Sequence, residues 1–349
     1  MNKFLVFLIG FVIIFSSCEK ERAQFDNNFS TGIFVVNQGV FQSGTGTITY
    51  RNEANDILIN DLFATQNNGK VLGNIAQSMI KFDNKYFIAV NNAAKIQVVN
   101  ASDFKIIGEI PIELPRYFAT DGTKLYVTSY NTDLASGKIN EVDTKNLTIS
   151  SSINVSNLPE NLLLTGDKLY VTLVSPFGQS SQDVLVVDTK SNQISKTINV
   201  GDNPNSIAKD KNGDIWVICR GNGFDPINGT LGSLHRLRDD QKVASFTLSN
   251  GANGLVVDND GDRLYFLMDE KVMAHDISDS TFEEESIYDE SINDENFDAI
   301  SYQPSTNRIF LSDVKDYNSV GEILIINPET KSTGRFDSGI APGFIYFAE

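Results

Sequence analysis

Four side chains with oxygen ligands recur at nearly equal spacing along the chain, each near the start of an apolar segment. They are Glu160, Asn205, Asn253 and Asp298. Carboxylate and amide oxygens are the ligands that a hard cation such as Ca²⁺ prefers, and a bound cation can polarise an ester carbonyl. Asn also suits tight turns for conformational reasons. The pattern leaves open both a metal-dependent hydrolase and a purely structural role.

A second set of residues with binding potential lies in five long segments that each carry an aromatic residue. Asn, Gln, Gly and Ser surround these aromatics. Aromatic rings stack on flat ligands, and side-chain amides hydrogen-bond to polar edges. The alternative is that each aromatic packs against its own loop. We expect a surface for a large, flat, polar-edged ligand, formed by Phe41, Arg116, Tyr117, Tyr130, Phe177, Arg220, Asn222, Phe224 and Tyr317.

The elements that must position these residues form a repeat. The clearest copies are PRYFATDGTKLYVTSY, PENLLLTGDKLYVTLV, PNSIAKDKNGDIWVIC and ANGLVVDNDGDRLYFLM, each with an apolar strand, a turn and a second strand that contains an aromatic residue. A third and a fourth strand follow, as in KIQVVN and KIIGEIPI. Four strands per unit at this period are typical of a β-propeller blade. The aromatics that align are Phe87, Tyr126, Tyr170, Trp216, Tyr265 and Phe310.

The two ends of the chain complement each other. GIFVVNQG matches a second strand, with Phe34 in the aromatic position, but no first strand precedes it. PGFIYF, at the other end, matches a first strand without a second. Joined, they complete a seventh blade and remove two exposed strand edges. The repeat therefore predicts an all-β fold, a closed seven-bladed propeller of four-stranded antiparallel blades over residues 32–349.

In such a ring the first strand of each blade lines the central channel. The connections between second and third strands meet those that lead into the next blade at one face, where ligands usually bind. The residue after the Pro, or its equivalent, is then expected at the channel mouth. This gives a ring of Gln77, Arg116, Glu160, Asn205, Asn253, Asp298 and Gly343.

The segment DNDGD, residues 258–262, has the composition of a calcium loop but not its pattern. Arg263 stands where an EF-hand loop needs glycine, and no distal glutamate or flanking helix follows. Other repeats carry DGTK and KNGD at the same position, on the face away from the predicted mouth. We interpret the segment as a hairpin turn.

Composition excludes several classes of function. The formal net charge of −17 disfavours binding to the phosphates of nucleic acids. After cleavage of a signal peptide, the only thiol other than Cys18 is Cys219, so no intramolecular disulfide is expected. The sequence has two histidines, His235 and His275, and both lie in predicted strands. The chain therefore has too few histidines to favour charge-relay catalysis or a histidine-rich metal site. The sequence therefore favours a protein that is not an enzyme.

The first residues are predicted to be a signal peptide. The apolar run from Phe4 to Phe15 is too short to span a bilayer but suits a signal-peptide core, and the small residues of FSSC lead into Cys18. This resembles a bacterial lipoprotein signal at residues 1–17, with Cys18 as the lipid anchor and residues 18–31 as a flexible tether. The alternative is an ordinary secretory signal with an incidental cysteine.

The motifs PNSIA, KLYVT and VLVVDT resemble those of the YncE-like seven-bladed propellers. With the lipoprotein signal, the opening GIFVVNQG and the closing PGFIYF, the chain is similar to the cell-surface propellers of Bacteroidota that include the corrinoid-binding lipoprotein BtuG. This resemblance implies a monomeric outer-membrane lipoprotein, facing the cell exterior, that captures a vitamin B12-type corrinoid for a TonB-dependent transporter. The corrinoid would be a transported ligand, and no cofactor is expected.

Two alternatives remain at this point. The run Glu160, Asn205, Asn253 and Asp298 resembles the calcium site of lactonase-type propellers, although that family has six blades. A surface scaffold that grips a protein or a glycan is the other alternative, since long loops on a rigid ring serve either purpose.

Overall fold

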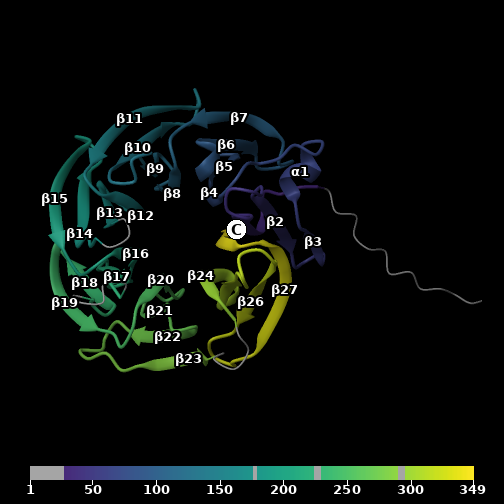
Figure 1. Cartoon of the computed structure of the whole chain (residues 1–349). Coiled ribbons are helices and arrows are strands. Elements are labelled where there is room, and N and C mark those ends of the chain that lie inside the picture. Colours follow the sequence, from purple (N-terminus) through teal and green to yellow (C-terminus); the bar gives the residue numbers. More distant parts are fainter. Residues whose placement is uncertain (1–26, 176–178, 224–228, 290–294) are drawn as a thin grey trace, which may run out of the picture.

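The chain folds into a ring of seven blades, as the repeat predicts. The computed structural model describes residues 27–175, 179–223, 229–289 and 295–349. Among them are seven four-stranded antiparallel sheets (Figure 1). From the innermost strand outward, the blades are β28 (Pro342–Ala348), β1 (Gly32–Asn37), β2 (Thr47–Asn52) and β3 (Ile57–Ile59); β4 (Ala76–Phe82), β5 (Lys85–Val90), β6 (Lys95–Asn100) and β7 (Ile106–Pro111); β8 (Pro115–Thr120), β9 (Leu125–Tyr130), β10 (Gly137–Asp143) and β11 (Thr148–Val155); β12 (Leu158–Thr165), β13 (Lys168–Val174), β14 (Asp183–Asp188) and β15 (Gln193–Asn199); β16 (Pro204–Lys209), β17 (Ile215–Cys219), β18 (Ser233–Arg238) and β19 (Gln241–Thr247); β20 (Ala252–Val257), β21 (Arg263–Met268), β22 (Lys271–Asp276) and β23 (Glu285–Asp289); β24 (Phe297–Gln303), β25 (Arg308–Asp313), β26 (Val320–Ile326) and β27 (Thr333–Ile340).

The last strand closes the ring on the first. β28 pairs with β1 in antiparallel register, with Phe34 opposite Tyr346 and Ile33 opposite Phe347. Every innermost strand contacts the innermost strands of both neighbouring blades, including β28 with β4 and with β24. The predicted seventh blade, shared by the two ends of the chain, is therefore confirmed, and both open edges are paired.

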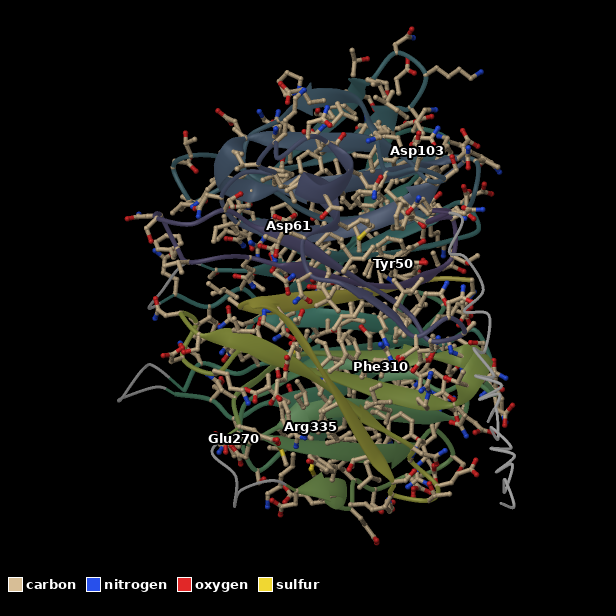
Figure 2. All side chains as sticks on the ribbon, turned by 90° about the vertical axis from the view of Figure 1, so that its right-hand side faces the viewer. Tyr50, Asp61, Asp103, Glu270, Phe310 and Arg335 are labelled. Atoms are coloured by element: carbon tan, nitrogen blue, oxygen red, sulfur yellow. The ribbon has the colours of Figure 1, made fainter. Side chains whose placement is uncertain are left out.

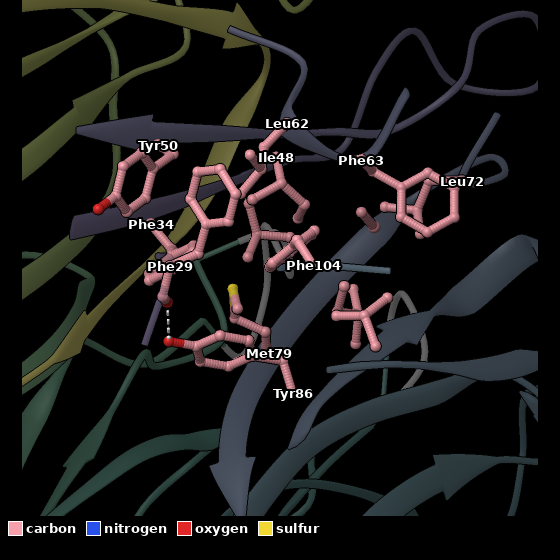
Figure 3. Close-up of a cluster of buried hydrophobic side chains, with 14 of the residues drawn as sticks. Phe29, Phe34, Ile48, Tyr50, Leu62, Phe63, Leu72, Met79, Tyr86 and Phe104 are labelled. Carbon is pink, nitrogen blue, oxygen red and sulfur yellow. Dashed lines mark hydrogen bonds between the residues drawn. The ribbon is translucent and has the colours of Figure 1, made fainter. Parts of the chain in front are cut away.

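The hydrophobic core lies between neighbouring blades. The aromatic residue of each second strand is at most 5% exposed. In the closing blade, Phe34 stacks on Phe104 of the next blade at 5.9 Å between ring centroids (Figure 3). Large flat side chains fill the wedge between twisted sheets at little cost in side-chain entropy. The equivalent residues in the other blades are Phe87, Tyr126, Tyr170, Trp216, Tyr265 and Phe310.

Phe29, three residues before β1, belongs to this core. Its side chain is fully buried, and its ring packs edge-on against Tyr50 at 5.0 Å between centroids. The Phe29 carbonyl accepts a hydrogen bond of 2.7 Å from the Tyr86 hydroxyl (Figure 3). Its N–H donates to the Ser102 carbonyl. The flexible tether predicted for residues 18–31 therefore does not extend to Phe29, because an aromatic ring there gains more from burial than its ordering costs.

Helical structure is limited, among the described residues, to short segments. α1 (Leu62–Gln66) follows β3, and Asp61 caps it by accepting the Ala64 N–H at 3.1 Å. Two 3-10 turns, η1 (Asn91–Ala93) and η2 (Pro304–Thr306), complete the set. No helix in this part of the chain has both the length and the apolar character needed to cross a bilayer.

The ring has two distinct ends. We call one end the mouth face; it carries the connections between second and third strands, including 38–46, 131–136 and 314–319, and those from each fourth strand to the next blade. The hairpin face, at the other end, carries the turns between first and second and between third and fourth strands. Figure 2 shows the ring from the side, with Glu270 of the mouth face and Asp103 of the hairpin face at opposite edges.

Candidate functional site

Every innermost strand contains a β-bulge at its mouth end. In β4 the pairing shifts between Ala76 and Ser78, and the other six innermost strands show the same irregularity at the equivalent point. A bulge leaves one or two residues unpaired and redirects their side chains. In β20 the skipped residue is Gly254, next to the predicted Asn253. In the other blades the skipped residues include the remaining members of the predicted ring: Gln77, Arg116, Glu160, Asn205, Asp298 and Gly343.

A buried hydroxyl in the second strand supports several of these bulges. Thr128, fully buried, accepts a hydrogen bond of 3.2 Å from the Tyr117 N–H and donates one of 2.7 Å to the Glu160 carbonyl of the next blade. Thr172 and Ser312 accept the equivalent N–H groups at 3.0 and 2.8 Å. A bulge frees backbone groups that need a partner when buried. The hydroxyl two residues after the blade aromatic, visible in LYVT, is therefore a signal for the mouth that our sequence analysis missed.

Arg116 and Glu160 form an ion pair across the boundary between the blades of β8 and β12. Arg116 donates from Nε to Glu160 Oε2 at 3.0 Å and from Nη2 to Oε1 at 2.5 Å. Nη1 donates to Oε1 of Gln77, from the third neighbouring blade, at 2.6 Å. The two charged side chains are 18% and 12% exposed. A bidentate guanidinium–carboxylate pair fixes both planes, so three blades share one rigid polar group.

Two tyrosines enclose this ion pair. The Arg116 guanidinium lies 4.8 Å from the ring centroid of Tyr130 and 5.6 Å from that of Tyr117. The Tyr130 hydroxyl donates to the Glu160 carboxylate, and the Tyr117 hydroxyl accepts from Gln77 Nε2 at 3.0 Å. Burial raises the pKa of both phenols, so both stay neutral at physiological pH. We call these five residues the Arg116 cluster; its two charges balance, and its rings and amide are pre-positioned.

A second polar group lies at the mouth around Asp298 of β24. The Tyr317 phenol, from the connection between β25 and β26, lies close enough to the Asp298 carboxyl for each group to shift the pKa of the other. Burial raises the pKa of Asp298, and the positive charges of Arg220 and Arg116 partly oppose this shift. Arg220, at the end of β17, is exposed, and Tyr317 is 45% exposed. Because Asp298 interacts electrostatically with Arg116, this Asp298 group and the Arg116 cluster share one mouth.

The remaining predicted contact residues lie outside these two polar groups. Phe41, in the connection 38–46, is 66% exposed at the rim of the mouth face. Asn222 is 8% exposed, and its N–H donates to Thr230 Oγ1 at 3.0 Å, so it anchors its own loop. Phe177 and Phe224 lie outside the described residues. The structure thus brings together Arg116, Tyr117, Tyr130, Arg220 and Tyr317 at the mouth, places Gln77 and Glu160 among them, and leaves Phe41 at the edge.

Comparison with known sequences places the chain in a family. The profile described as "Domain of unknown function (DUF5074)" matches residues 31–335, which covers five complete blades, the strands β1 to β3, and the sixth blade from β24 to the start of β27. This chain is a member of the DUF5074 family. A comparison with curated protein sequences gives no match.

Solved structures share the fold of this DUF5074 propeller at low sequence identity. A quinonprotein alcohol dehydrogenase-like protein from Bacteroides thetaiotaomicron is 15% identical, with a TM-score of 0.66 over 92% of this chain and 79% of the other. A protein from Lactobacillus plantarum is 13% identical, with a TM-score of 0.64 over 91% and 99%. A putative 6-phosphogluconolactonase from Bacteroides fragilis is 12% identical, with a TM-score of 0.61 over 94% and 99%. These likenesses show the fold alone.

Three of the four residues of the predicted calcium alternative have side chains that hydrogen-bond to protein groups in the DUF5074 structure. Arg116 and Tyr130 hold the Glu160 carboxylate. The side-chain amides of Asn205 and Asn253 donate to the carbonyls of Ala252 and Asp298 in the next blade, both at 3.4 Å. Across residues 27–349, apart from the three segments not described, no three His, Cys, Asp or Glu side chains are grouped to hold a metal ion. A cation at the mouth would first have to displace Arg116 from Glu160.

Exposed apolar side chains of the DUF5074 propeller gather on the mouth face. The large hydrophobic residues that are exposed in the described part of the chain fall into two groups. One group lies on the outermost strands of four different blades and comprises Leu58, Ile107, Ile194 and Val243. The other group lies in the connections of the mouth face or at their ends. Exposed apolar residues around a polar centre are typical of a binding surface. This second group comprises Phe41, Val71, Leu134, Leu231, Tyr317 and Val320.

Proposed function

We propose that this protein captures a ligand on its mouth face without transforming it. One observation carries the proposal: a rigid, charge-balanced cluster of Arg116, Glu160, Tyr117, Tyr130 and Gln77 stands at the centre of a face rimmed by exposed apolar side chains. Pre-positioned rings and amides lower the entropy cost of binding. A buried hydrogen-bond acceptor, Asn205 Oδ1, has no partner among the described residues, which suits a donor group on a ligand.

The groups that nucleophilic catalysis uses are poorly placed in the described part of the chain. Cys219 is buried, and burial raises the pKa of its thiol to about 12. His235 is 4% exposed in β18, where burial lowers its pKa to about 4 and both ring nitrogens contact serine hydroxyls. Neither group is therefore a reactive nucleophile or base at the mouth. This supports binding over hydrolysis.

A corrinoid is the ligand that we propose first. Its ring is broad and flat and carries amide side chains, so it presents a face for Tyr130, Tyr317 and Phe41 and an edge for Arg220. The resemblance to corrinoid-capturing surface lipoproteins leads to the same ligand. On this proposal Cys18 anchors the protein to the outer membrane, and a TonB-dependent transporter receives the corrinoid.

Titration of the purified protein with cyanocobalamin, followed by calorimetry and by the absorbance of the corrin ring, tests the proposal. We expect saturable one-to-one binding at micromolar concentrations. Tyr317→Ala and Arg220→Ala, both exposed at the mouth, should each weaken binding by about tenfold, as expected of contact residues. Val243→Ala removes a similarly exposed side chain from an outermost strand and should leave binding unchanged.

Two results would count against the proposal. Absence of heat and of any spectral change at micromolar concentrations would reject a corrinoid as the ligand. Equal losses in Val243→Ala and Tyr317→Ala would reject the mouth face as the binding surface, whatever the ligand.

A further inference from the structure

A cavity lies on the hairpin face, at the opposite end of the ring from the Arg116 cluster. It has a volume of about 600 Å³ and lies between the blade of β20–β23 and that of β24–β27. The β20–β21 turn and the end of β22 form one wall, and the segments after β24 and after β26 form the other. Tyr265 and Tyr302 line the cavity between the two walls.

Carboxylates outnumber cations around this cavity. Its acidic residues are Asp258, Asp260, Asp262, Asp276 and Glu329, and its basic residues are Arg263 and Lys331. Part of this charge is compensated: Lys211 binds Asp262 at 2.6 Å, and Arg263 lies 3.5 Å from Asp276. In the described part of the chain, Asp260 forms no hydrogen bond or ion pair and is exposed. The cavity therefore retains an excess of negative charge, which attracts cations.

The tyrosine pair adds a second, independent feature. Tyr265 and Tyr302 stack with 6.2 Å between centroids and 15° between planes. The Tyr302 hydroxyl donates to Asn307 Oδ1 at 2.7 Å. Tyr265 lines the cavity and is only 4% exposed, yet its hydroxyl has no hydrogen-bond partner among the described residues. This hydroxyl is not among the fully buried polar atoms without a partner, so it is accessible where Tyr265 lines the cavity and can hydrogen-bond to a group that enters it.

We propose that this cavity binds a small organic amine with two or more ammonium groups, of the polyamine class. The carboxylates are spread around the walls, and among the described residues they form no cluster of three that could hold a metal ion. A spread arrangement suits ammonium groups that an alkyl chain separates. One ammonium donates to Asp260 and another to the Tyr265 hydroxyl oxygen, while the methylene groups lie along the tyrosine rings.

Calorimetric titration with spermidine in about 150 mM NaCl, where the Debye length is about 8 Å, tests this site. We expect one site per chain. Asp260→Asn, an exposed substitution that leaves the core intact, should weaken binding about fivefold, the effect of losing one exposed charge pair. Tyr265→Phe should weaken binding about threefold without a change of charge. Glu283→Gln, at an exposed carboxylate that does not line the cavity, is the matched control and should bind as the parent protein does.

Three outcomes would overturn the inference. The first is unchanged affinity in both Asp260→Asn and Tyr265→Phe. The second is an equal loss in Glu283→Gln, which would indicate diffuse attraction to an acidic surface. The third is binding of MgCl₂ alone with the same affinity and the same dependence on Asp260, which would indicate a site for inorganic cations. Cyanocobalamin binding at the mouth is measured separately and does not depend on any of these results.

Discussion

The guanidinium of Arg116 and the carboxylate of Glu160 meet in a bidentate pair although they come from innermost strands of different blades. Each residue lies in a bulge, and the buried Thr128 hydroxyl hydrogen-bonds to both bulges. The geometry of the mouth is therefore determined by the contact between two blades. Substitutions in this contact should affect stability and binding together.

Removal of one member of this pair should destabilise the fold. Arg116→Met leaves the Glu160 carboxylate with no cation, and we expect the free energy of unfolding in urea to fall by about 2–3 kcal/mol, below the ~3–5 kcal/mol of a fully buried pair because both groups retain some exposure. Arg116→Met combined with Glu160→Leu should recover part of the loss. Lys95→Met, in a more exposed pair with Glu109, is the control and should change stability little. A double variant less stable than the single one would contradict this account.

The hydroxyl of Thr128 should contribute more to stability than the volume of its side chain does. Thr128→Val keeps the shape of the side chain but removes the acceptor of the Tyr117 N–H and the donor to the Glu160 carbonyl. We expect a loss of about 1–3 kcal/mol in the free energy of unfolding, since a buried N–H is left without a partner. Weaker ligand binding should accompany this loss, because both bulges lose support. Stability equal to that of the parent protein would show that water replaces the hydroxyl.

Phe29 should contribute to stability although it precedes the first strand. Phe29→Ala opens a cavity among Tyr50, Tyr86 and Phe104, and we expect a loss of about 3–5 kcal/mol in urea unfolding. Phe41→Ala, at a side chain that is 66% exposed, is the matched control and should change stability by less than about 0.5 kcal/mol. Equal effects of the two substitutions would place Phe29 outside the folded core.

His235 should make stability depend on pH between about 4 and 6.5. Burial lowers its pKa from 6.5 to about 4. Between these two pH values the imidazole is protonated in the unfolded chain and neutral in the folded chain. The contribution is complete above pH 6.5, decreases as the pH falls, and is lost at about pH 4; its size is about 3 kcal/mol. His235→Asn should remove this component. Urea unfolding at several pH values measures it, and an identical slope in both proteins would reject the assignment.

The fold could be predicted from sequence because hairpin chemistry and the blade aromatics repeat. Closure through Phe34 and Tyr346 followed from two incomplete repeats with complementary missing strands. The partners within the mouth could not be predicted, because a bulge changes the direction of a side chain without changing the repeat. Arg116 was predicted as a ligand contact and Glu160 only as an alternative metal ligand, and their pairing depends on the packing angle between two blades.

Other residues also have contacts that could not be predicted from the sequence. Asn222 was predicted to contact the ligand from the composition of its loop. Its backbone N–H donates to Thr230 Oγ1 and ties the loop together, a role the composition did not indicate, and its contact with a ligand stays a prediction. The segment 258–262 was interpreted as a turn, and its Asp258 does accept the N–H of Asp262 at 3.0 Å. The cavity beside it became visible only when the neighbouring blade supplied Tyr302 and Glu329.

The burial of Phe29 also determines at which end of the ring the described part of the chain begins. Phe29 binds Ser102 and Tyr86 at the hairpin face, so Asn27, the first residue described, leaves the ring on that side. Arg116 and Tyr317 lie at the mouth, at the other end of the ring, so the described chain starts on the face opposite to the proposed binding surface and leaves that surface uncovered by its own first residues.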